Sequence, residues 1–510
     1  MTAPALTVRQ LHVELRLRTS TVEAVKGVTL EAWQGRRLAL VGPSGSGKSM
    51  LARAVAGALP RAARLRGDIE VAGVDVLSKR PAGLVSMAFQ EAGASLNPTR
   101  TVAWHLRESC RVADVDPGDA VPRALEAVGL DHEHGTAYPF ELSGGQVQRA
   151  GLALALVTSP KVLIADEVTT ALDGETEADV MERLGALARS DSMTVIFVTH
   201  DLALVERWAD EIAVMHEGGI AERGETVGLF TNPTHPHTRD LLASRMPEVR
   251  LDDLRSSATE GRSAGDEPPL LDARALDKRF EAQHGRRITA LSGVDLAVGA
   301  GERIAVVGRS GSGKTTLLRL LAAVEHPDAG VVHWGGKEVA GLDRRSLRAQ
   351  RWRVQMVFQN PLAAFDPRHP VSEIVAAPLR SFPDRCPGAM GDRVAELLDA
   401  VGLEPDLAGR RPDQLSGGQR QRVAIARALS VDPEVLLCDE PVSSLDANLR
   451  RSVIELIAEL CSQRGMALVF VTHDLAPIPL LCQRAVVMEE GRIVERFEVN
   501  DSGRGAAGGR

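Results

Sequence analysis

The sequence predicts an α/β protein made of two similar halves, each with a core of parallel strands and a smaller helical subdomain. One set of motifs appears twice, in the same order, along the 510 residues. A repeat of this length in a chain of this size indicates two domains of the same fold. In the clearest part of the repeat, Leu142, Asp166 and His200 recur as Leu415, Asp439 and His473, each 273 residues further along the chain.

Short apolar runs predict the strands of both cores. They contain many β-branched residues and do not alternate with polar ones, which is typical of parallel strands covered by helices on both faces. Helical periodicity follows at 50–58 and 316–324, so strands and helices alternate. The predicted strands are 37–41, 161–165 and 194–199 in the first half, and 303–307, 435–438 and 467–472 in the second.

A helical insert precedes the Leu-Ser-Gly-Gly-Gln motif of each half. Residues 120–128 and 392–401 carry apolar side chains at helical spacing, which predicts a helical subdomain that presents this motif. A polar stretch rich in Gly, Ser and Pro joins the halves and predicts a flexible linker that spans on the order of 25 Å. The predicted domains are 1–248 and 271–498, with the linker at 249–270 and a frayed tail at 499–510.

Composition argues against several classes of protein. A net charge of −8 does not favour bulk nucleic-acid binding, which needs a basic surface. No run of about 18 apolar residues predicts a transmembrane helix, and the first residues lack the pattern of a secretory signal. The five cysteines are scattered and form no Cys-x-x-Cys pair, which fits a reducing cytosol and no cysteine metal site.

Both halves contain the pattern Gly-x-x-x-x-Gly-Lys-Ser/Thr between a predicted strand and a predicted helix, a P-loop. Its glycines let backbone N–H groups curl around phosphates, and the helix N-terminus adds its dipole. We expect Lys48 and Lys314 to neutralise the β- and γ-phosphates, and Ser49 and Thr315 to ligate Mg²⁺. The two loops comprise Gly42, Pro43, Ser44, Gly45, Ser46, Gly47, Lys48 and Ser49, and Gly308, Arg309, Ser310, Gly311, Ser312, Gly313, Lys314 and Thr315.

An acidic pair follows one apolar strand in each half. Asp166 and Asp439 end these strands, at the edge of a parallel sheet where ligands bind. We expect each aspartate to hold Mg²⁺ through water. The next residues, Glu167 and Glu440, are the candidate general bases that polarise the attacking water.

A glutamine and a histidine complete each set. Gln90 and Gln359 lie where the core passes into the helical insert, so we expect each to contact Mg²⁺ and to report the nucleotide state. His200 and His473 follow apolar strands in the sequence Val-Thr-His-Asp. A ring N–H at this position could hold the γ-phosphate and the attacking water.

With these motifs in this order, the chain resembles the ATP-binding cassette proteins over nearly all of both halves. The resemblance implies two P-loop NTPase (RecA-like) cassettes, ATP and Mg²⁺ as ligands, and ATP hydrolysis. In that family Leu-Ser-Gly-Gly-Gln is the signature motif, and its helix N-terminus faces the γ-phosphate held by the other cassette.

The resemblance therefore implies two shared sites. One would pair Lys48, Asp166, Glu167 and His200 with Ser416, Gly417 and Gly418, and the other would pair Lys314, Asp439, Glu440 and His473 with Ser143, Gly144 and Gly145. Gln146 and Gln419 complete the signature motifs, and Asp173 and Asp446 match the family's D-loop, which lines the shared interface.

The two halves differ at two family positions. The family stacks adenine on an aromatic residue about one strand before the P-loop; Phe280 fits this role, but Leu15 stands at the matching place in the first half. Stacking of a base on an aromatic ring contributes roughly 1–3 kcal/mol, so the first site is expected to bind ATP more weakly. Val168 also replaces the Pro441 of the second half. No catalytic position is lost, so we expect mild asymmetry with both sites competent.

Several segments resemble the peptide and nickel importers of this family. Residues 90–102 and 359–371 look like their glutamine loops, and 232–242 resembles the end of their first cassette. His235 and His237 lie in that Pro-rich segment, where packing or capping is favoured over metal binding. The cysteine-rich segment that usually binds an iron–sulfur cluster is absent after the first cassette: no cysteine lies between Cys110 and Cys386.

The resemblance implies the motor of an importer for peptides or for nickel and metallophore-type substrates. It implies two integral-membrane permease subunits, a substrate-binding protein outside the cytoplasm, no nucleic-acid partner, and a peripheral location on the cytoplasmic face of the inner membrane. The surface around Gln90 and 96–98, with its second-half counterpart, would receive the coupling helices of the permeases. An exporter motor is the main alternative. A translation factor of the ABC-F type is disfavoured because the join is short and unable to form a long charged helix, and a DNA-repair cassette ATPase because large insertions or zinc sites are absent.

Overall fold

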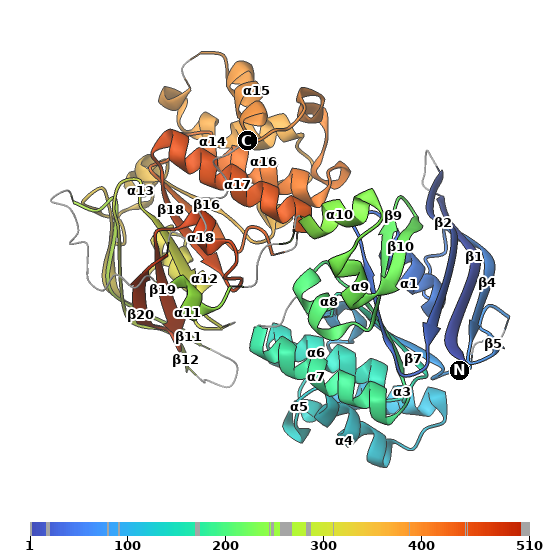
Figure 1. Ribbon diagram of the computed structural model, residues 1–510. Coiled ribbons are helices and arrows are strands. Elements are labelled where there is room, and N and C mark those ends of the chain that lie inside the picture. Colours follow the sequence, from blue (N-terminus) through green and yellow to red (C-terminus); the bar gives the residue numbers. More distant parts are fainter. Residues whose placement is uncertain are drawn as a thin grey trace. The chain divides into compact units, whose positions relative to one another are not determined.

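A computed structural model of the chain divides into two compact units, one centred on residues 1–245 and the other on 246–510 (Figure 1). The structure describes residues 3–16, 21–78, 81–89, 92–168, 174–243, 245, 249–255, 268–281, 287–309, 311–386, 388–443, 445 and 447–500. No helix in these ranges combines the length and apolar character needed to cross a membrane.

The first unit contains two sheets and a group of helices. Its strands are β1 (Pro4–Arg16), β2 (Thr21–Trp33), β3 (Arg37–Val41), β4 (Ala63–Val71), β5 (Val74–Asp75), β6 (Val85–Ala88), β7 (Val162–Asp166), β8 (Thr194–Val198), β9 (Glu211–His216) and β10 (Gly219–Glu225). Its helices are α1 (Lys48–Ala56), α2 (Ala92–Ser95), α3 (Val102–Ala113), α4 (Pro117–Ala127), α5 (His132–Thr136), η1 (Pro139–Glu141), α6 (Gly144–Leu156), α7 (Gly174–Ser190), α8 (Leu202–Trp208), α9 (Thr226–Thr231) and α10 (Pro236–Ala243).

The second unit repeats this plan. Its strands are β11 (Leu271–Glu281), β12 (Arg287–Val298), β13 (Arg303–Val307), β14 (Ala329–Trp334), β15 (Lys337–Glu338), β16 (Val354–Val357), β17 (Val435–Asp439), β18 (Ala467–Thr472), β19 (Arg484–Glu489) and β20 (Arg492–Glu498). Its helices are α11 (Leu251–Leu254), α12 (Lys314–Leu321), α13 (Arg344–Gln350), η3 (Pro361–Ala364), α14 (Val371–Ser381), η4 (Pro383–Arg385), α15 (Met390–Ala400), η5 (Pro405–Gly409), η6 (Pro412–Gln414), α16 (Gly417–Leu429), α17 (Ala447–Arg464) and α18 (Ile478–Leu481).

Each unit has a six-stranded, mostly parallel sheet and a four-stranded antiparallel sheet. The strand orders are β10-β9-β3-β8-β7-β6 and β2-β1-β4-β5 in the first unit, and β20-β19-β13-β18-β17-β16 and β12-β11-β14-β15 in the second. All predicted strands and the four predicted helical stretches are confirmed. The α/β class predicted from the repeat is therefore correct.

Burial explains why the parallel strands are apolar on both faces. Along β3, Leu38 and Leu40 pack with α1 and the antiparallel sheet, whereas Ala39 and Val41 pack with the helical layer on the other face. The strand β7 is buried throughout its length. Neither face reaches solvent, so no polar alternation is possible.

In each unit the insert forms a helical subdomain that ends with the helix of the signature motif. Figure 1 shows α14, α15 and α16 grouped on one side of the second unit, with β11, β12, β19 and β20 on the other. The subdomain core comes from apolar faces such as Val394, Leu397 and Leu398 of α15, which pack with α14 and α16. This arrangement separates the signature helix from the antiparallel sheet.

Part of the predicted linker is structured. Leu251–Leu254 forms α11, and Leu254 is buried in the core of the second unit. Arg255 donates to Glu495 at 2.8 and 2.9 Å and pairs with Val499 in an isolated bridge. The rest of the predicted linker at 256–267 and the end of the predicted tail at 501–510 lie outside the described residues.

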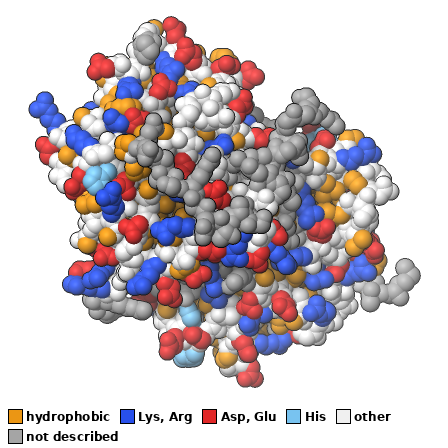
Figure 2. Space-filling model, turned by 60° about the vertical axis from the view of Figure 1, so that its left-hand side comes forward, with side chains coloured by type: hydrophobic (Ala, Val, Ile, Leu, Met, Phe, Trp, Pro, Cys, Tyr) orange, Lys and Arg blue, Asp and Glu red, His pale blue; other side chains and the backbone are white. Residues whose placement is uncertain are grey.

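Acidic and basic side chains are interspersed on the face drawn in Figure 2, where hydrophobic side chains occur in small groups. This mixture agrees with the modest net charge of −8.

An ion pair fixes the start of β3 against the turn before β9. Asp210 accepts hydrogen bonds from the backbone N–H of Arg37 at 2.9 Å and from its guanidinium at 2.7 and 3.1 Å. Burial alone would raise the pKa of Asp210, but these hydrogen bonds outweigh it and hold the pKa below its ordinary value of 3.8.

We expect Asp210→Ala to lower the free energy of unfolding of the first unit by about 1.5–3 kcal/mol, as for a lost hydrogen bond to a charged group. Because the folded-state pKa is lowered, the stabilisation is present above the ordinary pKa and is lost as the pH falls through the folded-state value. Urea titrations at neutral and acidic pH measure this, with Asp68→Ala on exposed β4 as the control. Equal stability of the two variants would contradict the expectation.

Candidate functional site

The two P-loops follow β3 and β13 and have nearly identical backbones. Gly47 and Gly313 both have φ of 101°, a left-handed conformation that favours glycine. A Cβ atom there would lie 2.3 Å from the carbonyl oxygen of Ala24 in the first unit and 2.4 Å from that of Ala290 in the second. Only glycine therefore lets the loop pass this close to the neighbouring strand, which places backbone N–H groups at the start of α1 and α12.

A buried lysine closes each loop. Lys48 Nζ donates to the carbonyl oxygens of Gly42 at 2.7 Å and Pro43 at 2.9 Å, and Lys314 Nζ donates to those of Gly308 and Arg309, both at 2.7 Å. The two side chains belong to residues that are only 8% and 6% exposed. The Oγ atom of Ser312 is also buried and has no hydrogen-bond partner among the described residues. A buried ammonium group close to a buried hydroxyl is the arrangement expected where an anionic ligand such as a triphosphate binds.

A hydroxyl and a carboxylate meet beside each loop. Ser49 Oγ donates to Asp166 Oδ1 and Thr315 Oγ1 donates to Asp439 Oδ1, both at 3.1 Å. Burial raises the pKa of both aspartates above the ordinary value. A small set of oxygen donors with one carboxylate is the chemistry that Mg²⁺ uses next to nucleotide phosphates, so these residues fit the expected ion.

The candidate base of the second unit lies in a polar cluster. Glu440 Oε1 is 3.1 Å from His473 Nδ1, and Glu440 Oε2 accepts a hydrogen bond from Gln359 Nε2 at 3.0 Å. Burial alone would raise the pKa of Glu440, but the hydrogen bond from His473 and the charges of His473 and Lys314 lower it overall. The hydrogen bond to Glu440 in turn raises the pKa of His473. The carboxylate is thus ionised and oriented, as a general base must be.

The first unit repeats part of this cluster. Glu167 Oε1 lies 3.4 Å from His200 Nδ1. Both glutamates have positive φ, 51° for Glu167 and 44° for Glu440, and their N–H groups donate at 3.0 Å to the carbonyl oxygens of Val198 and Val471. This backbone geometry holds each carboxylate at the carboxyl edge of the sheet.

Four expected site residues lie outside the described residues: Gln90, Asp173, Ser310 and Asp446.

The signature motifs begin helices with reciprocal caps. Ser143 Oγ accepts from the N–H of Gln146 at 3.3 Å, and Gln146 Oε1 accepts from the N–H of Ser143 at 2.8 Å. Ser416 and Gln419 repeat these bonds at 3.3 and 2.9 Å. Both serines are exposed, so each motif presents a helix N-terminus to solvent, with the partial positive charge of that end.

Strand register confirms that Leu15 and Phe280 are equivalent positions. Leu15 pairs with Val22 across β1 and β2, and Phe280 pairs with Ile288 across β11 and β12. Phe280 is 38% exposed, and Lys278 Nζ lies 5.5 Å from its ring centroid. The second unit therefore offers an aromatic face at a place where the first offers an aliphatic side chain.

Sequence reasoning did not single out Lys278 or the carbonyl oxygens of Ala24 and Ala290. Lys278 is two residues from Phe280 on the same strand face, which is a signal that the sequence does contain. The carbonyl contacts depend on how closely the neighbouring strand packs, and the sequence contains no such signal for them.

His235 Nδ1 accepts from the N–H of His237 at 3.3 Å, and the ring of His237 stacks on that of His216 with centroids 3.4 Å apart, which agrees with capping and packing.

Comparison with known proteins identifies relatives along the whole chain. The family model described as "ABC transporter" matches residues 25–170 and 291–443. The chain is 37% identical to the peptidoglycan transport ATP-binding protein YejF of Agrobacterium fabrum, over 97% of this chain and 92% of that protein. It is 36% identical to the glutathione import ATP-binding protein GsiA of Escherichia coli, over 96% of this chain and 85% of that protein.

A solved structure shares the fold over nearly the whole chain. The archaeal ribosome recycling factor aABCE1, in complex with the ribosomal stalk protein aP1, aligns with a TM-score of 0.62 at 21% identity, over 95% of this chain and 90% of that one. At this identity the likeness concerns the fold alone. Two P-loop units and two family matches along one chain lead to the same conclusion: this chain is an ATP-binding, ATP-hydrolysing protein and belongs to the ABC transporter family.

Proposed function

We propose that the chain is the motor subunit of an importer for peptides or for related substrates, including nickel or metallophore complexes. The observation that carries the proposal is the pair of motif sets in one chain that matches, nearly end to end, relatives named for peptidoglycan transport and glutathione import. The chain would work at the cytoplasmic face of the inner membrane with two permease subunits, supplied by a substrate-binding protein.

The described side chains support distinct roles in ATP hydrolysis. The lysines at the P-loops would neutralise the phosphates, and the Ser49–Asp166 and Thr315–Asp439 pairs would hold Mg²⁺, which supplies charge stabilisation to the phosphoryl group. Glu167 and Glu440 would accept the proton of the attacking water, and His200 and His473 would hold that glutamate in place. The contacts of Glu440 with His473 and Gln359 support this assignment most directly.

We further propose that each ATP site is shared between the two cassettes. The support is local: Ser143 and Ser416 are exposed N-caps of thirteen-residue helices, and a helix N-terminus attracts phosphate oxygens. Lys48 and its neighbours would use the Ser416 motif, and Lys314 and its neighbours would use the Ser143 motif. Closure of the two cassettes on ATP and opening after hydrolysis would then drive the permeases.

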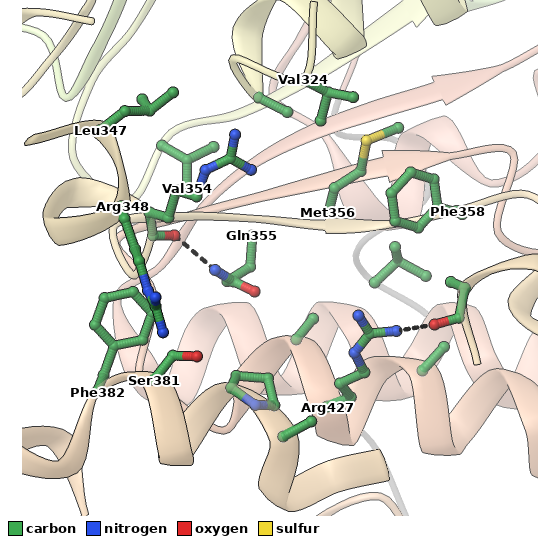
Figure 3. Close-up of a pocket in the computed structure, with 18 of the residues that line it drawn as sticks. Val324, Leu347, Arg348, Val354, Gln355, Met356, Phe358, Ser381, Phe382 and Arg427 are labelled. Carbon is green, nitrogen blue, oxygen red and sulfur yellow. Dashed lines mark hydrogen bonds between the residues drawn. The ribbon is translucent and has the colours of Figure 1, made fainter. Parts of the chain in front are cut away.

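A groove in the second unit is a suitable place for a permease to dock. It has a volume of about 910 Å³ and lies between the parallel sheet and the helical subdomain. Met356 and Phe358, which lead directly to Gln359, line it together with Ser381 and Phe382 of the subdomain side (Figure 3). A helix held in this groove would contact both parts of the cassette, so movement of one part against the other would be transmitted to the permease.

Purification of the full chain from its native membrane tests the proposed function. We expect it to co-purify with two integral-membrane subunits, and ATP turnover to increase when the ligand-loaded binding protein is added. Ribosomes in place of membrane subunits would refute the importer proposal. Substrate movement out of vesicles, in place of uptake, would favour an exporter.

Phe280→Ala is expected to weaken ATP binding by the second site by about 1–3 kcal/mol, as for a lost base–aromatic stack. The reverse change, Leu15→Phe, adds a ring at the equivalent position and should strengthen binding by the first site. Titration with a fluorescent ATP analogue measures both. Ile288→Ala, which alters the neighbouring exposed position on β12, is the matched control. Identical affinities for all variants would show that adenine does not stack at this position.

A further inference from the structure

The first unit has a cavity at the edge of its parallel sheet that lies opposite the candidate catalytic residues. The cavity has a volume of about 260 Å³ and lies between α4 of the helical subdomain and the segments that lead into β7 and β8. Pro160 and Met193 of its lining precede the amino ends of β7 and β8, whereas Asp166 and Glu167 stand at the carboxyl end of β7. The cavity is therefore separate from the ATP site.

The walls of this cavity are apolar and its rim is acidic. Ala120 and Ala124 of α4 and Leu187 of α7 contribute to the walls. Four exposed charged residues complete the lining: Asp116, Asp119, Asp191 and Arg123. Arg123 pairs with Asp191, and no ion pair or hydrogen bond within the described ranges engages the carboxylate of Asp119. Apolar walls below an acidic rim favour a cation that carries an apolar stem.

The second unit shows which side chain fills the same place. The helices α4 and α15, the helices α6 and α16, and the strands β7 and β17 each begin 273 residues apart, so the position of Ala120 corresponds to that of Arg393. Ser159 of the cavity corresponds to Asp432, and both have positive φ, 49° and 47°. Arg393 Nη2 donates to both carboxylate oxygens of Asp432 at 2.8 Å, and the arginine side chain is only 18% exposed. A guanidinium–carboxylate pair thus stands where the first unit has a methyl group and a hydroxyl group.

The first unit also has a carboxylate that can receive an added guanidinium. In the second unit Asp432 accepts from Arg464 at 2.7 Å as well as from the arginine of α15, so one carboxylate binds two guanidinium groups. In the first unit Asp191 stands at the position of Arg464, where it binds Arg123 and accepts from the hydroxyl of Ser190 at 3.0 Å. Because a carboxylate has about four acceptor positions, Asp191 has room for a second guanidinium.

We propose that this cavity binds an alkyl-guanidinium group, in the place that the side chain of Arg393 fills in the second unit. The alkyl stem would lie on Ala120 and Leu187, and the guanidinium would pair with Asp191 and face Asp119. A planar guanidinium matches a carboxylate better than an ammonium group does, and the volume suits a single side chain or a small molecule. The group can belong to a free small molecule or to an arginine of another protein. This inference does not rest on the proposed function.

Binding of butylguanidinium to the full chain tests this proposal. Butylurea, an uncharged molecule of nearly the same shape, is the matched control ligand, and ligand-detected NMR titrations measure both. We expect butylguanidinium to bind with a dissociation constant on the order of 1 mM, and butylurea to bind at least about tenfold more weakly because it forms no ion pair. Equal binding of the two ligands, or no binding of butylguanidinium, would overturn the inference.

Two variants of the first unit locate the bound ligand. A120R/S159D rebuilds the arginine–aspartate pair of the second unit, and D191N removes the charge of the proposed partner. We expect each to weaken butylguanidinium binding at least about tenfold, and A120R/S159D to keep or raise the temperature of unfolding because it fills a cavity. The control D68N, an exposed change on β4, should leave binding unchanged. Undiminished binding in A120R/S159D and D191N, or an equal loss in D68N, would contradict the proposed site.

A capped tripeptide with a central arginine identifies the source of the group. If the cavity receives an arginine of another protein, the tripeptide binds at least as tightly as butylguanidinium, and A120R/S159D weakens both. If the cavity receives a free small molecule, the peptide backbone does not fit and the tripeptide binds more weakly than butylguanidinium. Tripeptide binding that A120R/S159D leaves unchanged would exclude an arginine of a protein as the occupant.

Discussion

The double variant E167Q/E440Q is expected to hydrolyse ATP about 10²- to 10⁴-fold more slowly than the unaltered chain, which is the range for loss of a positioned general base. Glutamine preserves the size and shape of the side chain, but it cannot accept the proton and has one acceptor oxygen where the carboxylate has two. In the second unit His473 and Gln359 contact the two carboxylate oxygens of Glu440, so the variant keeps both contacts only if the amide of Gln359 turns to accept from the new NH2 group. Nucleotide binding should persist.

The single variants measure the contribution of each site. We expect both E167Q and E440Q to reduce turnover, and E440Q to reduce it more, because Phe280 in the second unit stands where Leu15 stands in the first. Glu489→Gln, an exposed change at the end of β19, is the control. Full activity in either single variant would show that its site is idle, and a double variant that retains normal turnover would remove both glutamates from the role of base.

Much of the fold and of each half-site could be predicted because the relevant physics is local. β7 and β17 are buried on both faces, so their apolar runs are unambiguous. Asp166 and Asp439 follow from the same runs, since a charged residue directly after a buried strand must lie at its edge. The glycines of the P-loops are recognisable in the sequence because a backbone with positive φ favours glycine. Gln359, Glu440 and His473 lie together because they follow β16, β17 and β18, which are neighbouring strands.

Other features depend on tertiary contacts that a pattern does not contain. Residues 249–255 are polar enough to resemble a linker, yet the buried Leu254 and the bonds of Arg255 to Glu495 tie α11 to the second unit. No predicted element covers α13, and nothing in its arginine-rich composition indicates that a groove lies beside it. The close approach of Ala24 and Ala290 to the P-loop glycines likewise depends on strand packing.

Pairs of substitutions in one chain should distinguish shared sites from separate ones. If Lys48 and Ser416 belong to one site, K48A/S416R damages that site alone, and Lys314 with Ser143 remains intact. K48A/S143R instead damages both sites. Effects within one site are not additive, whereas effects at separate sites combine. If each cassette hydrolysed ATP by itself, K48A/S143R would damage one site and K48A/S416R would damage both.

The most direct measurement counts the ATP retained per chain in the E167Q/E440Q background, which removes turnover, after rapid removal of free nucleotide. The shared-site account predicts that adding K48A/S416R leaves one retained ATP per chain and that adding K48A/S143R leaves none. The mirror pairs K314A/S143R and K314A/S416R should give one and none in the same order. Retention of one ATP by K48A/S143R and none by K48A/S416R would contradict the account and place each complete site within a single cassette.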